Sequence, residues 1–166
     1  MFTLGVMVML ALVEIRGSDG HISGADISFP PAKPGLDNLH AICTQGSGRP
    51  RYPSSVFGMS GTGRQRRQRS AVNRVEAWYS SCCAPGRAQE QALCCVKQAW
   101  EYALNTFCSE EYGVKSLPHK CCEQWGESRL TCFQREAPNR AYLPTPGYTA
   151  PDIAVNLRFT WDPSTC

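Results

Sequence analysis

The sequence predicts an all-α fold: a small helical domain cross-braced by disulfides, with irregular segments at both ends. Ten cysteines occur among 166 residues, and an even, high count of this kind is typical of a disulfide framework in an oxidising compartment. Apolar residues recur at spacings of three and four between residues 70 and 136, as they do along the buried face of a helix. Prolines concentrate in residues 21–35 and 139–166, which favours irregular structure there.

Eight of the cysteines follow a repeated order of single residue, adjacent pair and single residue. The two units are Cys43, Cys82–Cys83 and Cys95, then Cys108, Cys121–Cys122 and Cys132. Neighbouring side chains on a helix diverge by about 100°, so each member of an adjacent pair can reach a different neighbouring element. Spacing alone does not choose among the possible pairings. Cys94 and Cys166 lie outside the pattern; they could bond each other, or one could link to another chain.

The chain begins with an apolar stretch, residues 1–13, whose length suits the hydrophobic region of a secretory signal. Ser18 and Gly20 could occupy the small-residue positions before a cleavage site, so we expect a signal peptide over residues 1–20. No lysine or arginine precedes the stretch, and the alternatives are a buried apolar strand or a truncated upstream segment. No apolar run in the sequence approaches the length of a membrane span, about 18 residues.

The segment before the main helices is expected to be mostly irregular. Prolines exclude a helix from residues 21–35. Leu36, Leu39 and Ile42 then recur every three residues and predict a short helix with an apolar stripe. Residues 44–69, rich in Gly, Ser, Pro and Arg, are interpreted as a loop; a stretch of this length without secondary structure is usually functional or disordered.

The next two helices are marked by their start and stop residues. Ser70 is a favourable N-cap for the first helix, which Pro85–Gly86 ends. A longer helix is predicted from about Ala88 to Cys108, followed by a connection at residues 109–115. Ser116 can cap a short helix after that connection.

The last predicted helix spans Glu127–Glu136, and Pro138 closes it. The apolar positions of the helices are interpreted as core. They comprise Val72, Val75, Trp78, Tyr79, Cys82, Leu93, Val96, Trp100, Ala103, Leu104, Phe107, Leu130 and Phe133.

The composition argues against several classes of function. A net charge of +3 does not make the chain a polycation, and we expect no nucleic-acid partner. Zinc sites favour C-x2-C or closely spaced histidines, whereas His21, His40 and His119 are scattered, so no metal or other cofactor is expected. Catalysis needs a base and a nucleophile in company. His119 has no obvious partner and is interpreted as a surface or capping residue, so we expect no enzyme.

The most concentrated charge lies in a short stretch containing Arg64, Arg66, Arg67 and Arg69. Three interpretations compete. The first is a solvated loop. The second is a polyanion-binding site, because residues 65–70 have an X-B-B-X-B-X layout and arginine forks pair with sulfate and carboxylate oxygens. The third is proteolytic processing, because Arg64 to Arg67 fit an R-x-R-R convertase motif in a loop.

The cysteine spacing resembles the cross-bracing of serum albumin, in which each adjacent pair bonds crosswise to the flanking single cysteines. Further stretches extend the resemblance to the extracellular matrix protein 1 family: FPPAKPGLDNLHAIC (29–43), YSSCC (79–83), CVKQAWEYALNTFCSEEYGVKSLPHKCC (95–122) and ESRLTCFQREAP (127–138). The match covers about residues 25–142 and ends in an FQ-x-E-AP motif. The chain thus resembles one serum-albumin-like repeat of that family.

The resemblance implies an organisation and a disulfide pairing. The albumin-like repeat would occupy residues 21–142, and residues 143–166 would form a Pro-rich linker toward a second repeat. The implied bonds are Cys43–Cys83, Cys82–Cys95, Cys108–Cys122 and Cys121–Cys132. Because the family has several repeats, the chain could be a fragment or a short form.

The resemblance also implies a function: a secreted, non-enzymatic protein of the extracellular matrix that binds matrix proteins and proteoglycans. The family is associated with cartilage and bone formation and with blood-vessel growth. The implied partners are perlecan-like and fibulin-like proteins, the matrix metalloproteinase gelatinase B, and latent transforming growth factor β. The alternative is an albumin-like carrier of lipids or other small molecules, which would need an apolar pocket between the helices. Fold alone does not decide between these functions.

Overall fold

The computed structural model describes residues 27–44, 49–52, 62–113, 118–144 and 158–166. These residues form α-helices and short 3₁₀ helices and include no strand, which confirms the predicted all-α fold. The elements in chain order are α1 (Leu39–Cys43), α2 (Gly63–Cys82), α3 (Gln89–Tyr112), η2 (Lys120–Glu123), α4 (Gly126–Glu136) and η3 (Pro163–Thr165). The predicted signal peptide and Ser116 lie outside the described residues.

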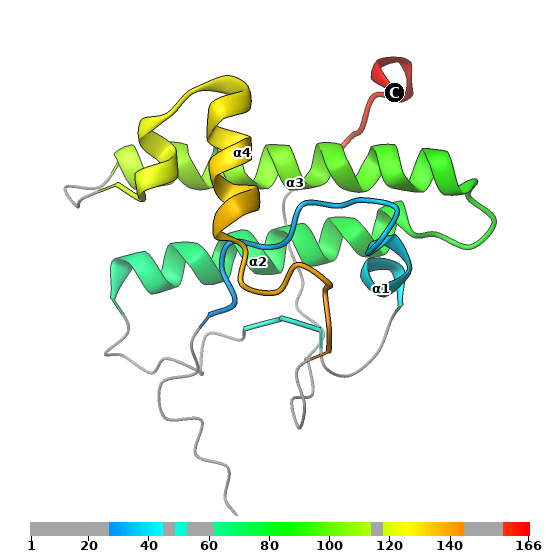
Figure 1. Ribbon diagram of the computed structural model, residues 1–166, viewed down its shortest axis with the longest axis horizontal. Coiled ribbons are helices and arrows are strands. Elements are labelled where there is room, and N and C mark those ends of the chain that lie inside the picture. The colour runs from blue at the N-terminus through cyan, green and yellow to red at the C-terminus, as the bar shows by residue number, and fades with distance from the viewer. Residues whose placement is uncertain (1–26, 45–48, 53–61, 114–117, 145–157) are drawn as a thin grey trace, which may run out of the picture.

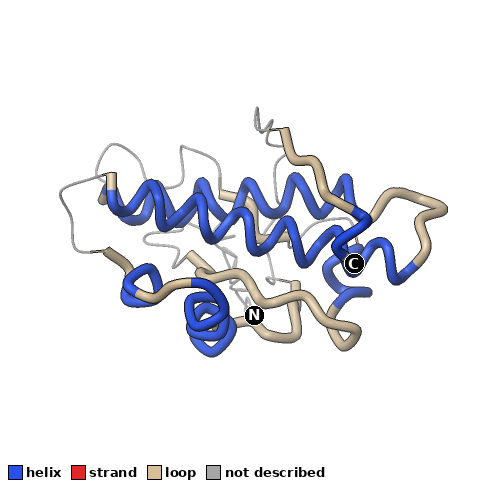
Figure 2. Tube along the Cα trace, turned by 90° about the horizontal axis from the view of Figure 1, so that it is seen from above, coloured by secondary structure: helices blue, strands red, loops and turns tan. Residues whose placement is uncertain are grey.

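The two long helices α2 and α3 form the centre of the domain. They run side by side in both views (Figures 1 and 2), and α4 runs across their direction in Figure 1. The turn between them contains Gly86, whose φ of 81° is in the left-handed region that glycine adopts without strain. The short α1 packs against α2, so the segment before the main helices covers one side of the pair.

Helix α2 begins seven residues earlier than Ser70, the start that the sequence predicted, so the interpretation of residues 44–69 as a loop is wrong from Gly63 onward. A capping box explains the early start: the hydroxyl of Thr62 accepts from the backbone N–H of Gln65, and the Gln65 side chain accepts from the N–H of Thr62. Arginine and glutamine are also good helix formers. The arginine-rich stretch is therefore the first part of α2.

The other helix boundaries agree more closely with the predictions. Helix α3 continues past Cys108 to Tyr112, since the intervening Ser109, Glu110 and Glu111 contain no helix breaker. The short helix before α4 is a 3₁₀ turn that His119 caps through its side chain. That contact places His119 in the capping role that the sequence suggested.

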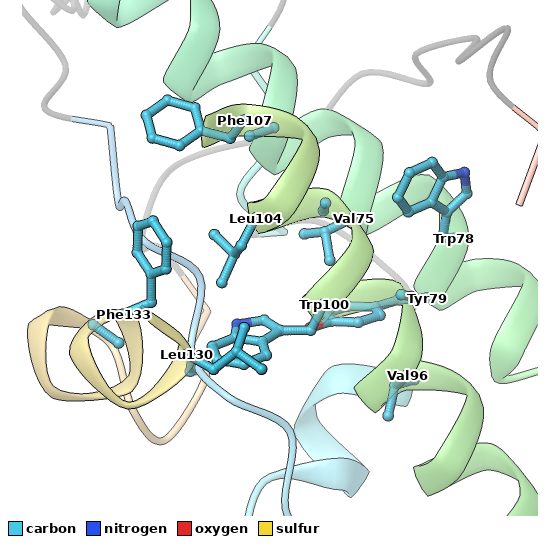
Figure 3. Close-up of a cluster of buried hydrophobic side chains, with 14 of the residues drawn as sticks. Val75, Trp78, Tyr79, Val96, Trp100, Leu104, Phe107, Leu130 and Phe133 are labelled. Carbon is cyan, nitrogen blue, oxygen red and sulfur yellow. The ribbon is translucent and has the colours of Figure 1, made fainter. Parts of the chain in front are cut away.

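Side chains from α2, α3 and α4 converge in one hydrophobic core (Figure 3). Trp100, Tyr79 and Phe107 are fully buried, as their apolar spacing predicted. The indole N–H of Trp100 donates to the carbonyl of Pro31 at 2.8 Å, so the extended segment before α1 is tied to the centre of α3. Leu36 is an exception to the predicted apolar stripe, because 69% of it is exposed.

Five disulfides brace the helices, with Cα–Cα distances of 5.2–5.7 Å. The structure pairs Cys43 with Cys83, Cys82 with Cys95, Cys94 with Cys166, Cys108 with Cys122, and Cys121 with Cys132. Four of these are the bonds that the resemblance implies. The fifth bond joins Cys94 to Cys166. Cys94 and Cys95 are therefore a third pair of neighbouring cysteines whose side chains bond to different segments.

The end of the predicted linker lies against the helices. Within residues 158–166, the Phe159 ring stacks on Trp78 with 5.1 Å between the ring centroids. The side-chain amide of Gln98 donates to the carbonyl of Asp162 and accepts from its N–H, both at 2.8 Å. We call residues 158–166 the C-terminal strap, because an aromatic stack, a side-chain clamp and a disulfide hold them on α2 and α3.

Candidate functional site

The first candidate site, the arginine-rich start of α2, is partly used for packing. Arg67 donates through Nε to Glu111 Oε1 on α3 at 2.7 Å. The side chain of Glu111 is fully buried, and that of Arg67 is 12% exposed. Arg64 and Arg66 are exposed, and Arg69 is half-buried. Because residues on a helix advance by about 100°, the four arginines do not form one continuous basic face.

This geometry changes two of the hypotheses about the segment. A convertase would have to act within a helix, whereas proteases preferentially cut exposed loop tips, so the premise of a loop site is wrong. The last arginine of the motif, Arg67, is also held by Glu111. The polyanion hypothesis stays a prediction, but it now concerns Arg64, Arg66 and Arg69.

A second arginine of α2 makes a similar contact with α3. Arg74 Nη2 donates to Glu110 Oε1 at 2.6 Å, and the Arg74 side chain is 4% exposed. Arg67 and Arg74 are two turns apart, and their acceptors Glu110 and Glu111 are adjacent. The two ion pairs therefore fix the alignment of α2 along α3.

A third ion pair is buried between α2 and residues 49–52. Arg49 Nε donates to Glu76 Oε2 at 2.7 Å, with side-chain exposures of 6% and 0%. The same guanidinium donates to the carbonyls of Ile42 and Thr44 at the end of α1. Burial raises the pKa of Glu76 to about 7, even though the charge of Arg49 acts in the opposite direction.

His119 is half-buried among aromatic rings. Its ring stacks on Phe133 with 5.4 Å between centroids and meets Phe29 edge-on. Its Nδ1 accepts from the N–H of Cys121 at 3.3 Å. Burial lowers the pKa of His119, and the positive charge of Arg64 lowers it further. The ring is thus a capping and packing group.

The most exposed large apolar side chain among the described residues is Trp125, at 74%. It is the N-cap residue of α4 and lies between Cys122 and Cys132, which are bonded to Cys108 and Cys121. The guanidinium of Arg129 lies over its ring, 5.0 Å from the centroid. Trp125 was not among the candidate functional residues predicted from the sequence. The sequence feature that could have indicated Trp125 is an aromatic residue just before the predicted helix Glu127–Glu136.

Arg129 is itself held in place, although it is a charged side chain. It is 8% exposed and donates to the carbonyl of Gln124 at 2.8 Å and to Asn105 Oδ1 at 3.0 Å. The nearby hydroxyl of Tyr112, a residue that is 51% exposed, donates to the carbonyl of Cys122 at 2.6 Å. We call Trp125, Arg129 and Tyr112 the Trp125 surface.

Metal sites, membrane spans and lipid pockets each have their own structural requirements. Among the described residues, no three His, Cys, Asp or Glu side chains are gathered as metal ligands would be. None of the helices in the described ranges combines the length and apolar character needed to cross a membrane. Polar and charged residues predominate in an open groove beside α4, whereas a second open groove, between α3 and the C-terminal strap, has similar shares of polar and apolar lining residues. Neither of these two open grooves is an enclosed apolar pocket of the kind that a lipid carrier needs.

The chain matches known proteins over most of its length. The family model described as Extracellular matrix protein 1 matches residues 16–165. Relatives with that name include the rat protein, 42% identical over 132 residues, and the mouse protein, 40% identical over 132 residues. The human protein is 38% identical over 136 residues.

These alignments cover 79–81% of the chain but 23–25% of the relatives, so the chain spans about a quarter of the length of the curated relatives it matches. No solved structure matches the chain. The family match and the sequence identities agree with the disulfide-braced helical fold described above. The chain is accordingly secreted to the extracellular matrix and belongs to the extracellular matrix protein 1 family.

Proposed function

We propose that the chain is a non-enzymatic interaction module of the extracellular matrix that binds a protein partner through the Trp125 surface. The main support for the proposal is an exposed tryptophan whose flanking chain segments are both restrained. Trp125 is 74% exposed, and the disulfides at Cys122 and Cys132 restrain the segments before and after it.

Tryptophan, tyrosine and arginine are the residue types that contribute most to the energy of protein interfaces. Trp125 and Tyr112 supply two of these types as exposed side chains, and the buried Arg129 lies over the Trp125 ring and supports it. Arg129 and Tyr112 are hydrogen-bonded before any partner arrives. A preorganised anchor loses little conformational entropy on binding, which improves affinity without any new contact.

The candidate partners come from the family rather than from the geometry. They are fibulin-like and perlecan-like matrix proteins, a matrix metalloproteinase that the chain would inhibit, and latent growth-factor complexes. Roles in bone formation and blood-vessel growth would follow from such binding. A module of this kind needs a rigid shape and an exposed anchor, and the disulfide-braced domain has both.

The test compares the oxidised wild-type chain with Trp125→Ala and with the control variant Leu143→Ala. Leu143 is 64% exposed, so both substitutions remove an exposed apolar side chain. Binding to immobilised fibulin-type and perlecan-type proteins would be measured by surface plasmon resonance. We expect Trp125→Ala to weaken binding about tenfold or more and Leu143→Ala to have little effect.

Equal binding by the wild type and Trp125→Ala would refute the Trp125 surface as the interface. The same preparation can be titrated with a fatty acid while its tryptophan fluorescence is followed. Saturable binding at micromolar concentration would instead support the albumin-like carrier.

A further inference from the structure

A groove with a volume of about 650 Å³ lies between the extended segment before α1, the middle of α3 and the second half of α4. Its walls come from segments that are far apart in the sequence. The lining residues used below are Lys33, Asp37, Asn38, Lys97, Arg135 and Arg140.

The groove is strongly basic. Lys33, Lys97, Arg135 and Arg140 line it, against the single carboxylate of Asp37. Its lining therefore carries a formal charge of +3, which equals the formal net charge of the entire chain. The charges of the rest of the chain nearly cancel, so the net positive charge is concentrated in one concave surface. Such a surface attracts anionic ligands.

The basic groups of the groove are not neutralised by close ion pairs. Lys33 is 3.9 Å from Glu127, a carboxylate on a side chain that is 77% exposed. Arg135 is 3.8 Å from its neighbour Glu136. Within the described residues, Lys97 and Arg140 form no ion pair at all. Long, exposed pairs of this kind contribute little energy, so an incoming anion can replace them.

The groove is also held in shape by the buried side chain of Asn38. Its amide nitrogen donates to the carbonyls of Lys33 and Arg140 at 3.1 and 3.0 Å, and its oxygen accepts from the N–H of Gly35 at 2.9 Å. Asn38 is 2% exposed. Two of the basic residues therefore have their backbones fixed in position before a ligand binds.

From this geometry we infer that the groove binds an acidic segment of a protein partner, one with two or three carboxylates. The inference deepens the proposed function, because it gives the chemistry of a second contact with the same partner. Lys33, which lines the groove, lies 3.9 Å from Glu127, and Glu127 is two residues from Trp125 in the chain. A partner anchored at Trp125 can therefore extend an acidic segment toward the groove.

A short acidic peptide fits the groove better than a dense polyanion does. Asp37 lies in the lining and repels every additional negative charge, so a densely sulfated chain is disfavoured more than a peptide with two or three carboxylates. The net charge of the lining matches a few carboxylates. The guanidinium groups of Arg135 and Arg140 can each hold a carboxylate in bidentate geometry.

The test measures binding of fluorescein-labelled hexaglutamate to the oxidised full chain by fluorescence anisotropy, with hexaglutamine as the neutral control peptide. The groove variant is Lys97→Gln/Arg135→Gln/Arg140→Gln. The matched control is Arg87→Gln/Lys120→Gln/Arg158→Gln, which removes the same number of charges from positions outside the groove lining. A labelled heparin hexasaccharide serves as a second probe.

We expect hexaglutamate to bind and hexaglutamine not to bind. The groove variant should bind hexaglutamate at least about tenfold more weakly, while the control variant keeps most of its affinity. Added salt should weaken the binding, because it screens the charges. Equal losses in the two triple variants would overturn the inference, since they would show attraction to overall charge rather than to the groove.

The heparin fragment could instead bind more tightly than hexaglutamate and lose its binding in the groove variant. That result would also overturn the inference and make the groove a glycan site. The proposed function is tested separately, because hexaglutamate has no aromatic or other large apolar side chain to pack on Trp125. Normal hexaglutamate binding by Trp125→Ala, together with unchanged partner binding by that variant, would refute the Trp125 surface while leaving the groove intact.

Discussion

Asn38 and Arg140 are joined by a hydrogen bond of 3.0 Å, from the Asn38 side-chain amide to the Arg140 carbonyl, although they are 102 positions apart in the sequence. This bond attaches the segment that follows α4 to the segment that precedes α1. Both segments are irregular, so backbone hydrogen bonds of a helix or sheet do not hold them. A single buried amide performs that role.

Replacing Asn38 with Ala should lower the free energy of unfolding by about 2–4 kcal/mol, because it leaves buried backbone groups without partners. Urea denaturation of the oxidised chain, followed by circular dichroism, measures the change. The control is Asn139→Ala, which removes two hydrogen bonds to exposed Leu143. A loss no larger than that of the control would show that the Asn38 bonds are unimportant for stability.

The pH dependence of stability should contain a contribution from Glu76. Its pKa is about 7 in the folded chain against an ordinary value of 4.5. Between these two values the folded state binds more protons than the unfolded state, so the contribution of Glu76 to stability falls as pH rises through this window. The expected decrease is on the order of 1–3 kcal/mol.

The measurement is the unfolding free energy of the wild type and of Glu76→Gln at several values between pH 5 and pH 8. The difference between the two isolates Glu76, because other groups titrate in both proteins. His119 is one such group. Its pKa is lowered in the folded chain, so its contribution to stability falls as pH drops below the ordinary pKa of histidine. This effect is opposite in direction to that of Glu76. Parallel profiles for the two proteins would contradict the prediction.

Arg67→Ser should be the most destabilising single change in the arginine-rich stretch, by about 3–5 kcal/mol, because it leaves the buried Glu111 carboxylate unpaired. Arg66→Ser, at an exposed position, should cost about 1 kcal/mol or less. Thermal and urea denaturation can compare the two. The double variant Arg67→Met/Glu111→Leu should recover most of the loss, since no buried charge remains unpaired.

Similar stability of Arg67→Ser and Arg66→Ser would show that the buried pair does not matter. If the prediction holds, polyanion binding by this stretch has to be tested with Arg67 retained. Retention on heparin would then be compared between the wild type and Arg64→Ser/Arg66→Ser/Arg69→Ser.

Cys94–Cys166 should be the first disulfide to open under mild reduction of the native chain. Cys166 is exposed, whereas both cysteines of Cys82–Cys95, Cys108–Cys122 and Cys121–Cys132 are buried. A reductant reaches an exposed bond more easily. Release of the C-terminal strap would also unstack Phe159 from Trp78 and change the tryptophan fluorescence.

Limited reduction followed by alkylation and peptide mapping identifies the first thiols. Earlier labelling of Cys43 and Cys83, which are half-buried, would contradict the expected order. The variant Cys94→Ser/Cys166→Ser is the control. It should keep the other four disulfides and its helical circular dichroism, because the strap is not part of the helix pair.

The sequence alone was sufficient for the helices whose apolar residues follow a clear period. Trp100 and Phe107 on α3, and Phe133 on α4, are buried as predicted, because a period of three to four residues is a local property of the chain. The cysteine order predicted that the members of each adjacent pair reach different elements, and the crosswise pairing itself was implied by the resemblance to serum albumin. The start of α2 was missed although its capping box, Thr62 and Gln65, can be read from the sequence.

The tertiary structure alone decided which charges are buried and which are gathered on one surface. Nothing near Arg67 in the sequence distinguishes it from Arg66, yet one is paired with a buried glutamate from another helix and the other is exposed. Lys33, Lys97, Arg135 and Arg140 come together only because α3, α4 and the irregular segments pack around the same core. Charged residues have no period that marks their partners, and their energies depend on desolvation by distant segments. The sequence therefore determines the scaffold, while packing determines where this protein carries its charge.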